Sequence, residues 1–216
     1  VTTTPGLRAS FKTKNADGTY VFYNSCSAPF DNRDPRLYGT VLYPGGKFRN
    51  TPCELQAGQL VLEGGNWVLK TAELGSKDAN GNIITSMNGP KRSNQQFVNK
   101  TGFYFRKFLD EATGSSMRNG ARSDMWWPYF RISEAYLIAC EASFETGNQS
   151  DAVTYINAVR NRAGVQPLTA VTFDNIVHEN AVEFAFEFHR WWDLKRWRIA
   201  DKVFDGDDNS TTARHR

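Results

Sequence analysis

The sequence predicts a mainly α-helical protein, in which a tetratricopeptide-like helical array follows a loop-rich region with short strands. Residues 1–125 are rich in Gly, Asn, Thr and Ser and lack sustained helical periodicity. Residues 126–204, by contrast, carry apolar side chains at the spacing of amphipathic helices. The last stretch, 205–216, is predicted to be a polar loop at which the chain is truncated. The sequence therefore predicts two main regions and a short tail.

The composition excludes several classes of protein. Hydrophobic residues make up 40% and charged residues 23% of the 216 residues, which is typical of a globular protein. The net charge of +3 is small and spread out, which argues against nucleic acid as the main partner. No apolar run approaches the roughly 18 residues that span a bilayer. The three Cys, at 26, 53 and 140, are too scattered for a disulfide scaffold or a zinc site, although pairing of Cys26 with Cys53 stays open.

Short apolar segments between turn signals predict the strands of the first region. Along the chain they are 20–23, 39–43, 67–69 and 83–84. Asp17-Gly18, Pro44-Gly45-Gly46 and Asn80-Gly81 supply the turns beside them. One or two short helices are also expected among these loops.

Three helices are predicted in the second region, over 131–147, 150–164 and from about 172 to 198. Gly147 fits a left-handed C-cap, Ser150 an N-cap, and Pro167 prevents continuation of the second helix. The first two helices make a hairpin of about 34 residues, the length of a tetratricopeptide unit. We expect the side chains of Tyr136, Ile156, Phe184 and Trp192 to be buried.

Charged residues on the third helix allow two interpretations. Glu179, Glu183 and Glu187 recur every four residues, and a basic run threaded by tryptophans follows: Arg190, Trp191, Trp192, Lys195, Arg196, Trp197 and Arg198. One interpretation is a polyanion site with stacking residues. The other, which we favour, is that the indoles pack on neighbouring helices while Glu and Arg form ion pairs. Glu134, Glu141, Arg160 and Arg162 are likewise expected to be structural.

No catalytic, metal or cofactor site is predicted. The His178-Glu179 pair lacks the second His of a zincin helix. Residues 78–82 have too few carboxylates for a calcium loop, so a hairpin turn is preferred. A pair of carboxylates for glycoside hydrolysis stays open, because the separation of such a pair is spatial.

Three ordered motifs in the second region resemble the C-terminal part of the SusD/RagB family of nutrient-binding lipoproteins. They are FRISEAYLIACEA (130–142), AVTYINAVRNRAG (152–164) and ENAVEFAFEFHRWWDLKRW (179–197). Weaker likenesses lie at 34–37 and 101–107. Asn180 stands where the family usually has a basic residue, and Phe188 where it usually has Gly.

The resemblance implies a non-enzymatic protein of the outer membrane and cell surface, held by a lipid anchor that lies outside this fragment. Such proteins bind oligosaccharides for import through a partner TonB-dependent transporter. Two alternatives remain: a peptide-binding subunit of the same type of uptake complex, and a helical-repeat scaffold for protein partners. An enzyme is the least favoured reading.

The resemblance also places the ligand contacts in variable loops, here within residues 1–125. Sugar rings stack on aromatic side chains, while Asn and Arg side chains bind hydroxyl groups. The candidates are therefore the aromatic residues Trp67, Tyr38, Tyr43 and Phe48, with Asn66 and Arg49 as polar partners. Trp67 is the first choice, because it follows a Gly-Gly turn that can present its indole. Core packing is the competing interpretation for each of them.

Overall fold

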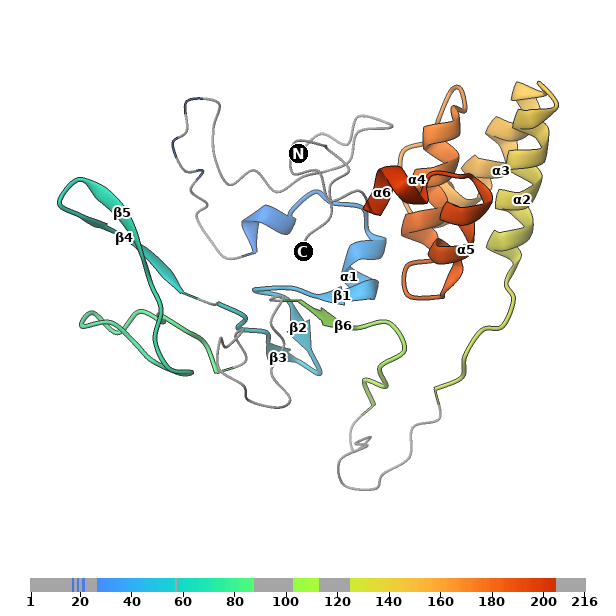
Figure 1. Ribbon diagram of the computed structural model, residues 1–216. Helices are drawn as coiled ribbons and strands as arrows, with labels where there is room; N and C mark the ends of the chain where they lie inside the picture. The colour runs from blue at the N-terminus through green and yellow to red at the C-terminus, as the bar shows by residue number, and fades with distance from the viewer. Residues whose placement is uncertain are drawn as a thin grey trace. The chain divides into compact units, whose positions relative to one another are not determined.

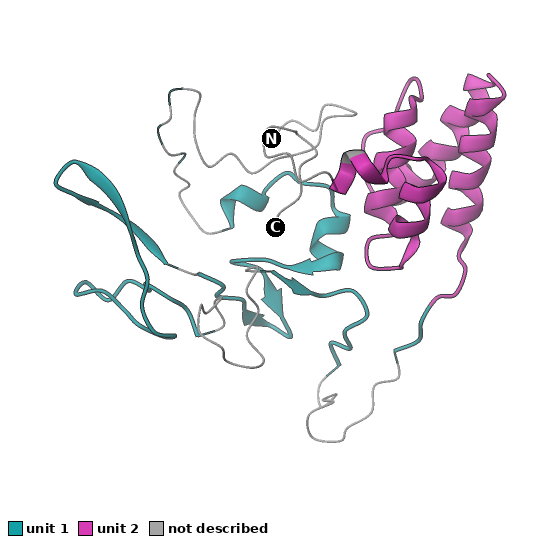
Figure 2. Cartoon of the chain, viewed as in Figure 1, with its two compact units in different colours: residues 1–2, 9–127 teal, residues 3–8, 128–216 magenta. Residues whose placement is uncertain are grey.

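The computed structural model describes residues 27–56, 58–87, 103–112 and 125–204, together with residues 17, 19 and 21. The chain divides into two compact units, with a boundary between Trp127 and Pro128 (Figures 1 and 2). Of the strand predicted at 20–23, only Val21 is described, and the tail predicted at 205–216 lies outside the described residues.

The first unit consists of short elements joined by turns. Its helical segments are the 3-10 helix η1 (Ala28–Phe30) and the helix α1 (Arg36–Thr40). Within the described part of this unit, the strands form three antiparallel pairs: β1 (Val41–Leu42) with β6 (Tyr104–Phe105), β2 (Lys47–Phe48) with β3 (Thr51–Pro52), and β4 (Gln59–Glu63) with β5 (Asn66–Lys70).

Two predicted strands are shorter than expected. Within 39–43 only β1 is a strand, because Gly39 and Thr40 belong to α1, whose first turn is held by a hydrogen bond from the Arg36 amide to Asp34 Oδ1 at 2.9 Å. Ile83 forms a single bridge with Lys77 across the turn at Asn80-Gly81. The predicted strand at 67–69 is confirmed within β5.

The β4–β5 hairpin depends on its two-glycine turn. Gly64 and Gly65 both have positive φ, at 57° and 81°, which is the requirement of a type I′ turn and is easily met only by glycine. The turn fixes the register, in which Leu62 lies opposite Trp67 and Leu60 opposite Leu69.

The second unit is helical, with α2 (Ile132–Glu145), α3 (Gln149–Arg162), α4 (Phe173–Glu183), α5 (His189–Arg196) and α6 (Ala200–Phe204) (Figure 1). Gly147 has the predicted left-handed conformation, with φ 78°. The N-cap of α3 is Asn148, not Ser150 as predicted, because the Asn148 side chain accepts from the Asp151 amide at 3.2 Å. Thr172 begins α4 in a capping box with Asn175.

The predicted long third helix is wrong, since it breaks between α4 and α5. Phe186 and Phe188 adopt positive φ, at 65° and 64°, a conformation that disfavours continuation of a right-handed helix. The Glu187 amide bonds back to the Phe184 carbonyl at 2.9 Å, which closes the turn. A bulky aromatic residue in this conformation requires support from its surroundings.

The core of the second unit joins α2, α3 and α4. Its buried members are Leu137, Cys140, Ala152, Ile156, Val159, Leu168, Val171, Ile176 and Phe184. The predicted burial of Ile156 and Phe184 is therefore confirmed. The predicted burial of Tyr136 and Trp192 is wrong, since these side chains are 37% and 66% exposed. Leu194 is the buried residue of α5, and Trp197 packs against the core instead of Trp192.

A pair of phenylalanines tests this assignment of the core. Phe184→Ala should lower the free energy of unfolding by about 3–5 kcal/mol, because it empties a site that is 3% exposed. Phe188→Ala is the control, since Phe188 is 77% exposed in the same turn, and it should change stability far less. Chemical denaturation measures both variants. Equal effects would contradict the burial described here.

Candidate ligand-binding site

The two glutamates of α4, Glu179 and Glu183, are buried and paired. The Glu179 side chain is fully buried, and its Oε2 accepts from Arg160 Nη1 of α3 at 2.7 Å. Arg160 also donates to the Gln166 carbonyl at 3.0 and 2.7 Å. A buried carboxylate needs such a counter-ion and such hydrogen bonds. Glu179 and Arg160 therefore hold α4 against α3 and the segment that follows it.

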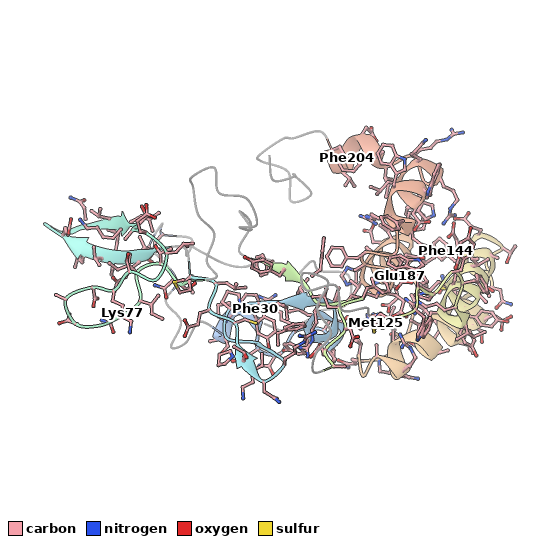
Figure 3. All side chains as sticks on the ribbon, turned by 90° about the horizontal axis from the view of Figure 1, so that it is seen from below. Phe30, Lys77, Met125, Phe144, Glu187 and Phe204 are labelled. Atoms are coloured by element: carbon pink, nitrogen blue, oxygen red, sulfur yellow. The ribbon has the colours of Figure 1, made fainter. Side chains whose placement is uncertain are left out.

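Arg131 makes a second group of contacts at the α4–α5 turn. It donates to both oxygens of Glu187 at 2.9 Å, to the Glu183 carbonyl at 2.7 Å and to Glu183 Oε1. Its guanidinium carbon lies 4.6 Å from the centre of the Phe184 ring. Arg162 of α3 adds a contact of 2.5 Å to the same Glu183 oxygen. One guanidinium thus joins the start of α2 to both ends of the turn, and Figure 3 labels Glu187 within this helical unit.

Glu141 connects α2 to α5. Its oxygens accept from both terminal nitrogens of Arg196, one of them at 2.9 Å, and from Trp197 Nε1 at 2.9 Å. Burial raises the pKa of Glu141, but the hydrogen bonds from Arg196 and Trp197 outweigh this effect and lower it overall. Arg190 donates to the Val177 carbonyl at 3.4 Å. The interpretation of these Glu and Arg residues as links between helices is confirmed.

The calcium-like sequence at 78–82 forms a hairpin turn. Asp78 accepts hydrogen bonds from the amides of Asn80 and Asn82 and from the side chains of Asn82 and Gln59. These bonds, led by those from Asn82, lower the pKa of Asp78 to about 2. Within the described part of the chain, no group of three or more His, Cys, Asp or Glu residues is placed to hold a metal ion.

Tyr38 and Tyr43 lie together in the first unit. Their ring centres are 5.6 Å apart, and Phe30 lies 4.7 Å from Tyr43. The Tyr38 hydroxyl donates to the Phe30 carbonyl at 2.7 Å. Both tyrosines are half-buried, so these contacts are those of a small aromatic core.

Arg49 is held in place by neighbouring residues. It donates to the Asp110 carbonyl at 2.7 Å, and its guanidinium carbon lies 5.4 Å from the centre of the half-buried Phe48 ring. The side chain is exposed and links the β2–β3 pair to the segment after β6.

Trp67 and Asn66 lie on a different sheet, at the start of β5. The predicted residues are therefore divided between two places in the first unit. Trp67 is 41% exposed, and Asn66 is exposed beside the glycine turn. Because directly opposed residues share a face of a two-stranded sheet, the register places Leu60, Leu62 and Leu69 on the face of Trp67. All four side chains are exposed, and we call this set the hairpin face.

The three leucines of the hairpin face were not among the predicted site residues. In the sequence, Leu60 and Leu62 stand two residues apart, as do Trp67 and Leu69, and this spacing places each pair on one face of its strand. The spacing alone does not say whether that face of the hairpin meets solvent. The indole in this setting offers a flat apolar platform with one N–H donor.

The helical unit, whose α2–α3 hairpin has the length of a tetratricopeptide unit, defines a tetratricopeptide-like class of protein. Residues 1–214 match the SusD family. The chain therefore belongs to the SusD family, and the predicted family and fold class are confirmed.

Three relatives illustrate the likeness. SusD-like protein P2 of Formosa agariphila is 36% identical over 104 residues, which are 42% of this chain and 21% of that protein. A SusD-like protein of Bacteroides ovatus is 31% identical over 80 residues, 35% of this chain and 15% of that protein. A crystal structure of a SusD-like carbohydrate binding protein from Bacteroides fragilis matches with a TM-score of 0.60 and 25% identity. That match covers 94% of this chain and 37% of the solved chain.

The described helices show no candidate membrane span, because none is long and apolar enough. Cys53 and Cys140 are free thiols, and burial raises the pKa of Cys140 to about 11. Cys26 lies outside the described residues.

Glu183→Gln tests the structural role of the paired glutamates. Removing the charge leaves Arg131 without one of its carboxylates, so stability should fall by about 3–5 kcal/mol. Glu63→Gln is the matched control, because Glu63 pairs with Lys70 at the surface, and it should lose under about 1 kcal/mol. Lost glycan binding by Glu183→Gln at unchanged stability would assign this residue to a site instead.

Proposed function

We propose that this chain is part of a non-catalytic cell-surface protein that binds oligosaccharides for import through a partner TonB-dependent transporter. Membership of the SusD family carries the proposal. The Bacteroides fragilis relative, described as a SusD-like carbohydrate binding protein, supports the ligand class. A location at the outer membrane through a lipid anchor belongs to the same proposal.

The chemistry of the hairpin face supports Trp67 as a sugar platform. The C–H faces of a pyranose ring are apolar and can cover the exposed indole. Asn66, the neighbouring residue, has an amide that can donate to and accept from hydroxyl groups. A short hairpin with a fixed register holds the platform in place before the ligand arrives, which reduces the entropy lost on binding.

The state of the carboxylates supports binding without cleavage. Most glycoside hydrolases use two carboxyl groups that flank the substrate bond. Glu179, Glu183 and Glu187 are buried and each is paired with arginine. These glutamates stabilise the helical unit, and the proposal gives them no part in chemistry.

A peptide is the second candidate ligand, and the leucines of the hairpin face favour it. Leu60, Leu62 and Leu69 add aliphatic surface around the indole, and such surface suits apolar peptide side chains as well as sugar rings. A peptide that lies on this face would contact all four side chains, whereas a stacked sugar depends chiefly on the indole.

Trp67→Ala tests the platform. The affinity for an oligosaccharide identified on a glycan array should fall by roughly 1–3 kcal/mol, by analogy with stacking of bases on aromatic residues. Leu69→Ala is the matched control, because Leu69 lies on the same strand and the same face but has no ring. Calorimetry measures affinity, and thermal unfolding checks that both variants stay folded.

The two ligands give different patterns in this pair of variants. Loss of oligosaccharide affinity in Trp67→Ala alone supports sugar stacking. A peptide ligand would instead bind where no oligosaccharide does, with an equal loss of peptide affinity in both variants. Unchanged affinity in Trp67→Ala removes Trp67 from the site. Hydrolysis products in an overnight incubation with the oligosaccharide would overturn the non-catalytic role.

A further inference from the structure

The outer face of α5 carries two adjacent tryptophans that the core does not use. Trp191 and Trp192 are 53% and 66% exposed, contrary to the packing expected from the sequence. The ring of Phe204, on α6, lies 6.1 Å from that of Trp191, and Figure 3 labels this residue at the end of the helical unit. These three rings, with Lys195, form what we call the α5 face.

Lys195 lies against both indoles. Its ammonium nitrogen is 5.5 Å from the ring centre of Trp191 and 5.3 Å from that of Trp192. These are its interactions among the described residues, where no carboxylate lies within ion-pair distance of it. A cation over two exposed rings is attracted by their π-faces and keeps the capacity to bind an anion.

Among the described residues, the neighbouring charges leave the α5 face with a net positive charge. Asp193 is paired with Arg196 at 3.2 Å, and Arg196 also binds Glu141. Arg198, in the left-handed conformation just after α5, is exposed and adds positive charge at this end of the helix. Asp201 on α6 is the exposed acid nearest in sequence to this end.

We propose that the α5 face binds an anionic saccharide, one that carries carboxylate or sulfate groups. The inference rests on the proposed glycan-binding function and adds a second site with its own ligand class. The C–H face of a sugar ring would stack on an indole while its anionic group pairs with Lys195, a charge-assisted contact. A neutral sugar would leave the ammonium unused, and a polyanion without rings would leave the indoles unused.

The test compares four probes by calorimetry on the whole chain. Tetragalacturonate presents carboxylates, a κ-carrageenan tetrasaccharide presents sulfates, maltotetraose is neutral, and oligothymidylate is a polyanion with flat bases. One or both anionic saccharides should bind, and more weakly at high salt because surface charges are screened. Which of the two binds identifies the anionic group.

Three variants assign that binding to the α5 face. Lys195→Gln should lower the affinity for the anionic saccharide about tenfold, equivalent to about 1.4 kcal/mol of binding free energy. Lys195→Arg should retain most of the affinity, and Trp192→Ala should lose it to a similar extent as Lys195→Gln. Lys47→Gln is the control, because Lys47 is an exposed lysine of the first unit, and it should have no effect.

The outcomes separate this inference from the proposed function. Unchanged affinity in Lys195→Gln, or tighter binding of oligothymidylate than of either anionic saccharide, overturns the inference. Binding of neutral glycans that depends on Trp67, without binding of anionic ones, overturns it as well and leaves the proposed function standing. Absence of binding to any saccharide contradicts both.

Discussion

Three buried carboxylates, two on α4 and one in the turn that follows it, must be neutralised inside the second unit, and its arrangement follows from that constraint. Glu179 is held by Arg160 of α3, and Glu183 and Glu187 by Arg131 at the start of α2. A buried carboxylate without its arginine would be strongly destabilising. The arginines therefore fix where α2 begins and how α3 lies against α4. They also secure the turn in which Phe186 and Phe188 adopt their unfavourable conformation.

The same ion pairs distinguish the side chains that hold the helices together from those exposed at the surface. Many of the charged residues that resemble a catalytic or polyanion site in the sequence form links between helices, as with Glu141 and Arg196, whereas Lys195 does not. Exposed aromatic side chains outside these links carry the two proposed sites. They are Trp67 on the hairpin face and the pair of tryptophans beside Lys195. Both surfaces are aromatic, which suits the proposed binding of sugars.

Local signals in the sequence predict much of this structure. The glycines at 64, 65 and 147 and the cap at Thr172 determine local backbone geometry, so the turns and helix starts beside them could be predicted. The break at 184–188 could not, because phenylalanine is no turn signal and the turn depends on a distant arginine. Helical periodicity locates the apolar residues of a helix, but it does not show which of them are buried. In α5 the Leu194 side chain is buried and the Trp192 side chain is exposed. For the candidate site, Trp67 and its turn could be predicted, whereas the engagement of Tyr38 and Arg49 by carbonyl groups needed the tertiary structure.

A double-mutant cycle on Arg160 and Glu179 tests most directly whether paired charges hold the helical unit together. The variants are Arg160→Met, Glu179→Gln and the two combined, with the free energy of unfolding measured by chemical denaturation. If the pair acts as a unit, each single change is costly and the combined change adds little. The coupling energy should then be about 1–3 kcal/mol. If the losses of unfolding free energy in the two single variants add up to the loss in the double variant within about 0.5 kcal/mol, the two charges act independently. That result would contradict the account.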